Sequence, residues 1–220
     1  ILSMSRVSAI HGPVIYSNYG STAATVLYDK ESDLYNLFFA QLDTIQTQFN
    51  ANKTYAGFAK FDPSYKGSIP AWQKVVNSVR LKLAMRISKV NPALAKTQGE
   101  KALADANGLI ATNADNFNIS LLGNIMPVGM ICFQWDDARM GAPIESFMVG
   151  LKDGRIAKYF SPADNASLYA DHPTSPYKGI RNGAFLDAKI QRVTFSKVST
   201  DFNSVQTRRH FTASEVHFLR

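Results

Sequence analysis

One short stretch of the chain combines acidic, basic and aromatic residue types. The sequence FQWDDARMG, residues 133–141, contains the neighbouring carboxylates Asp136 and Asp137 between Trp135 and Arg139. Two carboxylates beside a sugar-stacking ring could cleave a glycosidic bond, one as acid and the other as base or nucleophile. Adjacent side chains usually diverge in direction, so we interpret the stretch as part of a binding site. A glycoside hydrolase that uses Asp136 or Asp137 is the less favoured alternative.

Aromatic rings recur through the same half of the chain. Tyr159, Phe160, Tyr169 and Tyr177 stand among Asp, Asn, Lys and Arg residues. Sugar sites combine flat apolar surfaces with a few placed polar groups, and this composition suits them. Any single ring could instead fill the space beneath a long loop. The pattern predicts a glycan site that includes Trp135, Asp136, Asp137, Arg139, Tyr169 and Tyr177.

Other kinds of chemistry find no support in the motifs. The chain has no GxGxxG, GxxxxGK[ST], HExxH, GxSxG or CxxC pattern. Cys132 is the single cysteine, which excludes an internal disulfide and leaves no thiolate cluster for zinc. The four histidines lack metal-ligand spacing, since only His210 and His217 are near each other. We therefore expect no metal and no cofactor, and the chain shows none of the strong catalytic motifs.

Composition describes a globular chain with scattered positive charge. Hydrophobic residues make up 45% of the 220 residues and charged residues 19%, which is too apolar for a disordered chain. The net charge is +7, but basic residues are spread from Arg6 to Arg220 and belong to no nucleic-acid-binding module. No apolar run reaches the roughly 18 residues that a membrane span needs. We expect neither nucleic-acid binding nor a transmembrane segment within this chain.

The first half of the sequence has the periodicity of amphipathic helices. Apolar residues at helical spacing predict a helix over residues 29–50, and Gly and Pro residues then predict a loop over 50–70. A second helix follows Pro70, with one apolar face from Trp72 to Val90 and basic side chains bordering it. On this helix we interpret Asn77 and Arg86 as hydrogen-bonding groups at a helix–helix contact.

A third helix begins at a recognisable corner. Asn91-Pro92 ends the preceding helix and opens the next one, with Asn91 as its cap, and Asn107-Gly108 stops it. Two helices joined by so short a corner form an αα-hairpin, the unit of helical repeat proteins.

Beyond residue 110 the periodicity fades. Asn, Asp and Pro residues predict irregular backbone, with short helices at 144–151 and 154–160 and a strand at 191–198. Long loops of this kind are often functional, so the ligand site is expected here. Thr212 to Glu215 has the form of a capping box, but the chain stops at Arg220. We therefore divide a single domain fragment into a helical scaffold (1–110), a loop-rich ligand-binding region (111–210) and the start of a truncated helix (211–220).

These segments together resemble a known family. The run AWQKVVNSVRLKLAMRISKVNPALAK resembles the Trp-x-Lys-x-x-Asn-Ser-x-Arg-Leu-x-Leu-Ala-Met-Arg signature of SusD/RagB-type outer-membrane lipoproteins of Bacteroidota. GPVIYSNYG, YDKESDLYNLFFAQLD, LKDGRIAKYFSPA, PYKGIRNGAF and TASEVHFLR are similar to family segments in the family's order. Gly154 is a departure, because the family often has Pro there. The signature residues in this chain are Trp72, Asn77, Ser78, Arg80 and Arg86.

The resemblance implies a fold, a location and a function. It implies a mainly α fold of tetratricopeptide-like helical pairs with long irregular loops, in an incomplete chain that is the central part of a longer protein. It also implies a non-enzymatic lipoprotein on the outer face of the outer membrane, held by a lipid anchor outside this fragment. Such a protein captures glycan or another nutrient and delivers it to a SusC-like TonB-dependent transporter. Peptide capture, and a tetratricopeptide-type scaffold without a small ligand, are the alternatives.

Overall fold

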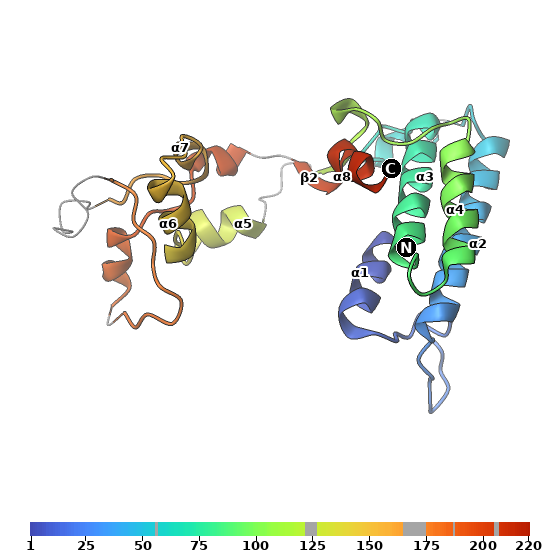
Figure 1. The fold of residues 1–220 in the computed structure, drawn as a ribbon, viewed down its shortest axis with the longest axis horizontal. Helices are drawn as coiled ribbons and strands as arrows, with labels where there is room; N and C mark the ends of the chain where they lie inside the picture. The colour runs from blue at the N-terminus through green and yellow to red at the C-terminus, as the bar shows by residue number, and fades with distance from the viewer. Residues whose placement is uncertain (56, 122–126, 165–174, 187, 205–206) are drawn as a thin grey trace. The chain divides into compact units, whose positions relative to one another are not determined.

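The computed structural model describes residues 1–55, 57–121, 127–164, 175–186, 188–204 and 207–220. The chain forms two compact units, each described by itself below (Figure 1). The first unit contains Ile1–Ile119 and Arg209–Arg220, and the second contains Ser120–Arg208. The sequence pattern placed its divisions at residues 110 and 210 within a single domain fragment. The roles of scaffold and ligand-binding region stay predictions.

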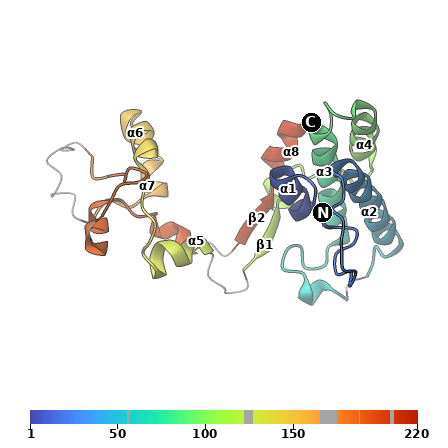
Figure 2. The same cartoon turned by 90° about the horizontal axis from the view of Figure 1, so that it is seen from below.

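The first unit is a set of packed helices. Its elements are α1 (Leu2–His11), α2 (Glu31–Ala51), η1 (Ala59–Phe61), α3 (Ile69–Arg86), α4 (Pro92–Ala104), η2 (Asn113–Asp115) and α8 (Ala213–Leu219). The strands β1 (Phe117–Ser120) and β2 (Thr207–Phe211) pair side by side in a two-stranded sheet (Figure 2). Helix α3 is the centre of the unit, because α2, α4 and α8 all pack against it.

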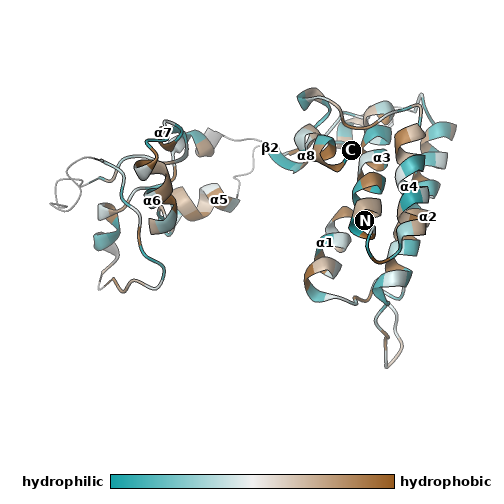
Figure 3. Cartoon of the chain, viewed as in Figure 1, coloured by the Kyte–Doolittle hydropathy of each residue, from teal (hydrophilic) through white to brown (hydrophobic). Residues whose placement is uncertain are grey.

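The core of this unit lies between the helices that the periodicity predicts. Apolar and hydrophilic positions alternate along α2, α3 and α4, as expected for helices buried on one side (Figure 3). Leu34 and Phe38 of α2 and Leu83 of α3 are completely buried. Phe211 and Val216, from the end of the chain, join the same cluster. The C-terminal segment therefore completes a core that begins with α2.

Both α3 and α4 begin with a side-chain cap, and the cap of α4 confirms the predicted corner. Ser68 Oγ accepts a hydrogen bond from the Ala71 amide at the start of α3, and Asn91 Oδ1 accepts one from the Leu94 amide at the start of α4. Helix α3 ends at Arg86, however, and residues 87–90 form turns. The prediction that the apolar face continues to Val90 is wrong, because Val90 is 87% exposed beyond the end of the helix.

The signature segment places polar groups inside the helical unit. Trp72 Nε1 donates a hydrogen bond to the Asp62 carboxylate at 2.9 Å. The Ser78 hydroxyl oxygen accepts a hydrogen bond from the buried Ile110 amide at 2.9 Å. Asn77 is buried, accepts a hydrogen bond from Gln46, and donates to the Gly108 carbonyl. These contacts hold α2 and the segment after α4 against α3.

The two signature arginines have opposite environments. The Arg80 side chain is only 2% exposed, and its guanidinium donates to Asp43 of α2 at 2.6 Å and to Gln98 of α4 at 2.5 Å. Arg80 therefore joins three helices instead of bordering the buried face. Arg86 is exposed, so its interpretation as a helix-contact group is wrong. Arg86 is the last residue of α3, so no further turn of this helix covers its side chain.

The start of α8 shows half of the predicted capping box. The Thr212 hydroxyl accepts a hydrogen bond from the Glu215 amide, as the motif predicts. The Glu215 carboxylate binds Lys82 of α3 in place of completing the box. This ion pair fixes α8 to the central helix, so the motif contributes a tertiary contact as well as a cap.

The second unit is irregular. Its elements are α5 (Pro127–Gly129), the π-helical turn η3 (Met130–Gln134), α6 (Ala142–Gly150), α7 (Ile156–Tyr159), and the 3-10 turns η5 (Lys189–Thr194) and η6 (Thr200–Ser204). The two short helices agree with the prediction. The predicted strand over 191–198 is wrong, since η5 covers its first half and Val198 forms only an isolated bridge with Phe160. The Arg192 carbonyl accepts hydrogen bonds from the Arg139 side chain and the Phe195 amide, so it is not available to a neighbouring strand.

Candidate ligand-binding site

The acidic stretch of the second unit forms a tight turn closed by its own arginine. Asp136 has a positive φ of 54°, and Asp137 follows it. Arg139 donates to the Asp136 carboxylate at 2.9 Å, to the carbonyls of Asp136 and Ala138, and to the Arg192 carbonyl. The Arg139 side chain is 3% exposed. A ligand cannot reach a guanidinium that is covered and used in this way, so we reassign Arg139 from ligand contact to positioning the turn.

The two carboxylates of this turn have different basic partners. Asp136 pairs with Arg139, whereas Asp137 binds the Arg192 guanidinium at 2.6 Å. Lys197 lies 3.8 Å from Asp136 and 3.0 Å from Asp164. The carboxylates therefore diverge, as expected for neighbours in the chain. An arrangement in which each acid is neutralised by its own cation suits a structural or ligand-contacting role better than paired acid–base catalysis.

The three aromatic positions of the predicted site have three different outcomes. Trp135 precedes the acidic turn, and 54% of its surface is exposed. Tyr177 is half-buried, and its amide donates to the Ser175 hydroxyl. Tyr169 lies outside the described residues. Trp135 is therefore the ring that the structure leaves most open to a ligand at this turn.

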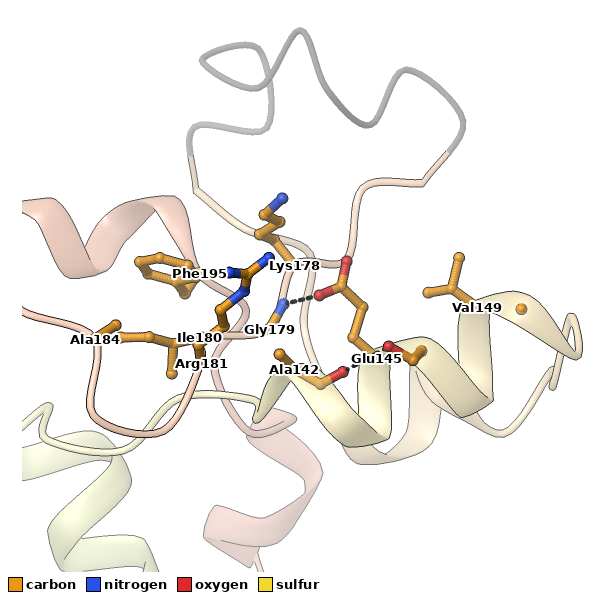
Figure 4. A pocket seen from close by; sticks show the side chains of 11 residues that line it. Ala142, Glu145, Val149, Lys178, Gly179, Ile180, Arg181, Ala184 and Phe195 are labelled. Carbon is orange, nitrogen blue, oxygen red and sulfur yellow. Dashed lines mark hydrogen bonds between the residues drawn. The ribbon is translucent and has the colours of Figure 1, made fainter.

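The structure adds a cavity that the sequence pattern did not indicate. It has a volume of about 570 Å³, within the range of small-molecule sites (Figure 4). Helix α6, the residues that follow Tyr177 and the residue after η5 form its walls. The lining residues are Ala142, Glu145, Ser146, Val149, Gly150, Lys178, Gly179, Ile180, Arg181, Ala184 and Phe195.

Backbone hydrogen bonds bring the two main walls of the cavity together. The Ile180 amide donates to the Met140 carbonyl and the Ala142 amide donates to the Ile180 carbonyl, both at 2.8 Å. Gly141 and Ile180 form an isolated parallel bridge. A Cβ at Gly179 would lie 2.6 Å from the Gly141 carbonyl oxygen, so only glycine permits this approach.

Glu145 ties α6 to the glycine of the opposite wall. Its side chain lies in the first turn of α6, and its Oε2 accepts a hydrogen bond from the Gly179 amide at 2.7 Å. Glu145 is 9% exposed. This hydrogen bond fixes one carboxylate oxygen against the opposite wall of the cavity.

Two segments link the cavity to the acidic turn. Arg192 in η5 binds Asp137, and three residues later Phe195 lines the cavity. The Met140 amide, directly after Arg139, donates to the Ser196 carbonyl, and the Ser196 amide donates to the Lys178 carbonyl. The turn around Asp136 therefore positions the cavity walls through hydrogen bonds within the same unit.

No metal site can be built from the described part of the chain, which contains no group of three or more His, Cys, Asp or Glu side chains able to hold an ion. Cys132 is a free, buried thiol in η3. Burial raises the pKa of this thiol, and the Arg139 charge opposes the rise only in part. The thiol therefore stays protonated at neutral pH and packs as a small apolar side chain.

Among the helices in the described ranges, none is both long and apolar enough to cross a membrane. The described structure is a helical unit and a second unit that bears a ligand-sized cavity. The chain belongs to the SusD-like family, described as "Susd and RagB outer membrane lipoprotein", whose model matches residues 1–220. This is a family of outer-membrane binding lipoproteins, not of enzymes. The mainly α, SusD-like fold and the family predicted from the signature are thus confirmed.

Solved structures agree with this assignment. A chitin-binding SusD homolog from Flavobacterium johnsoniae is 37% identical, with a TM-score of 0.79, and the match covers 98% of this chain and 44% of that one. A SusD homolog from Bacteroides uniformis is 31% identical, with a TM-score of 0.75 and coverage of 99% and 44%. A SusD homolog from Bacteroides vulgatus is 29% identical, with a TM-score of 0.77 and the same coverage. The chain thus spans less than half the length of these relatives. No curated protein gives a significant match.

Proposed function

We propose that the protein containing this chain captures oligosaccharide at the cell surface and delivers it to a partner TonB-dependent outer-membrane transporter. The observation that carries the proposal is the 37% identity, over almost the whole chain, to a chitin-binding SusD homolog. A ligand-sized cavity with charged and aromatic walls in the second unit supports it. Chitooligosaccharides, the soluble pieces of chitin, are therefore the first ligands to test.

In this proposal the two units have separate tasks. The second unit holds the sugar, with Trp135 and Phe195 offering ring faces while Glu145 and the basic side chains of the cavity bind polar groups. The helical unit is the scaffold and faces the transporter. Its tightly connected interior, centred on Arg80 and Asn77, suits an element that keeps its shape while ligand is transferred.

Glycan binding is tested with the complete natural polypeptide on a glycan array, followed by calorimetry with chitooligosaccharides. We expect Trp135→Ala and Tyr177→Ala each to weaken binding about tenfold, the size of one lost stacking contact. Tyr19→Ala is the matched control, because Tyr19 is 87% exposed in the first unit. Unchanged binding in both second-unit variants would remove them from the site.

The same experiment separates the alternative functions. Binding to a peptide library and not to glycans would favour peptide capture. Hydrolysis of the glycans that Asp137→Asn abolishes would favour an enzyme. If the polypeptide co-purifies with a TonB-dependent transporter yet binds neither sugars nor peptides, it is a scaffold without a small ligand. Absence of any such transporter from the purified complex would contradict the delivery step.

A further inference from the structure

The cavity of the second unit contains a carboxylate oxygen to which no described residue donates a hydrogen bond. Glu145 is 9% exposed and gives its Oε2 to the Gly179 amide. Among the described residues no hydrogen-bond donor is assigned to its Oε1. The bonded oxygen turns toward Gly179, and the other oxygen points away from it, on the side toward which Lys178 also extends (Figure 4). Glu145 Oε1 is not one of the fully enclosed side-chain oxygens of the described residues, so a ligand in the cavity that brings an N–H or O–H can reach it and donate to it.

Two basic residues belong to the lining of the same cavity. Lys178 and Arg181 line the same cavity, and Arg181 makes no side-chain hydrogen bond or ion pair with any described residue. The Arg181 guanidinium can therefore donate a hydrogen bond to a carbonyl oxygen of a ligand. The cavity therefore pairs one acceptor, Glu145 Oε1, with cationic donors.

Apolar surface completes the walls. Phe195, Val149 and Ala142 line the cavity together with the charged groups. A secondary amide that bears a methyl group has a donor, an acceptor and an apolar end within a few bonds of one another. A plain hydroxyl could also donate to Glu145, but it brings neither the carbonyl oxygen nor the methyl group.

We propose that this cavity recognises the acetamido group of an N-acetylated sugar, with Glu145 Oε1 accepting the hydrogen bond from the acetamido N–H. Arg181 donates to the acetamido oxygen, and the methyl group lies against the apolar wall. This inference rests on the proposed function, because it names the sugar substituent that the glycan site distinguishes. Glu145 is thereby a specificity-determining residue, since it binds the acetamido group, which N-acetylglucosamine has and glucose lacks.

Glu145→Gln tests the proposal with little disturbance of the fold. The glutamine carbonyl can still accept the Gly179 amide, but the cavity then receives an NH₂ donor where the acetamido N–H needs an acceptor. Calorimetry is done on the complete natural polypeptide with two β-1,4-linked oligosaccharides of equal length, one of N-acetylglucosamine and one of glucose. We expect the variant to bind the N-acetylated oligosaccharide at least tenfold more weakly and the glucose oligosaccharide within twofold of the unchanged protein.

The control and the two ligands make each outcome decisive. Glu100→Gln removes the same charge from the exposed face of α4 and should leave both affinities unchanged. Equal weakening of both oligosaccharides by Glu145→Gln would show a purely structural role and overturn the proposal, as would no change in either. An unchanged protein that binds both oligosaccharides equally would also overturn it while leaving glycan capture intact. A protein that binds neither refutes glycan capture itself and the proposal with it.

Discussion

Replacing Arg80 by methionine should weaken the helical unit more than any change at the neighbouring signature arginine. The Arg80 guanidinium lies within the unit and connects α3 to Asp43 of α2 and Gln98 of α4. Methionine fills much of the volume of the arginine stem but cannot donate. Arg80→Met therefore removes the polar connection while limiting the cavity. Arg86→Met is the matched control, because Arg86 is exposed near the end of the same helix.

The magnitude follows from the partners that remain. A hydrogen bond that involves a charged group contributes about 1.5–3 kcal/mol, and Arg80 makes two. The Asp43 side chain is 44% exposed and keeps its contact with Lys101 at 2.7 Å, so its share is small after solvent screening. Gln98 is partly exposed and can turn to water. We therefore expect Arg80→Met to lower the free energy of unfolding by about 2–3 kcal/mol, against less than about 0.5 kcal/mol for Arg86→Met.

Urea unfolding measures this difference. The chain has two tryptophans, and in a Trp135→Phe background Trp72 alone reports on the helical unit. With an m-value of about 2 kcal/mol/M, the urea midpoint should fall by about 1–1.5 M in Arg80→Met and hardly move in Arg86→Met. Equal shifts in the two variants would refute the reasoning, because they would mean that burial and partners do not separate the two arginines.

Two further predictions concern acid stability and the cavity wall. Burial raises the pKa of Asp115, but hydrogen bonds led by that from Lys74 outweigh burial and lower this pKa to about 2. Because the folded-state pKa of Asp115 lies below the ordinary 3.8, the carboxylate adds to the free energy of unfolding above about pH 4, and this stabilisation is lost as the pH falls toward 2. Asp115→Asn should therefore flatten the dependence of the free energy of unfolding on pH in this range. Gly179→Ala should destabilise the second unit by about 1–3 kcal/mol and weaken glycan binding, since the new Cβ would meet the Gly141 carbonyl. Gly150 is the control, because a Cβ added there meets open space and its φ is ordinary. Gly150→Ala should leave the urea midpoint, followed by Trp135 fluorescence, unchanged, and equal effects of the two variants would contradict the packing argument.

The helical unit could be predicted from the sequence because its signals are local. A face repeats every three to four residues along α2 and α3, and Asn91-Pro92 marks the corner chemically. Each of these signals acts within a few residues of the place that it determines. The errors occur where that locality fails. Val90 continues the pattern although the helix has ended, and Arg80 looks like a surface base until its partners on two other helices are known.

The candidate site depended on contacts between distant residues. Trp135 and its acidic neighbours can be recognised in the sequence as one short motif. The motif does not reveal that the Arg139 side chain donates a hydrogen bond to the carbonyl of Arg192, 53 residues away. Strand-like alternation at 191–198 was misleading for a similar reason. A strand needs a partner edge, and here the backbone carbonyl of Arg192 already serves the acidic turn.

Glu145 gave no signal in the sequence, because a glutamate in the first turn of a short helix is expected on helix grounds alone. Its distinct position arises only when Gly179, 34 residues later, brings its amide close enough to bind one carboxylate oxygen. That hydrogen bond fixes the carboxylate against the cavity wall and leaves the second oxygen directed away from the glycine. The glycine that permits the backbone approach thus also determines which oxygen a ligand can meet. One contact thus contributes both to the fold and to ligand recognition, and two variants separate these roles. Gly179→Ala should weaken the binding of every oligosaccharide, whereas Glu145→Gln should weaken the binding of the N-acetylated oligosaccharide only.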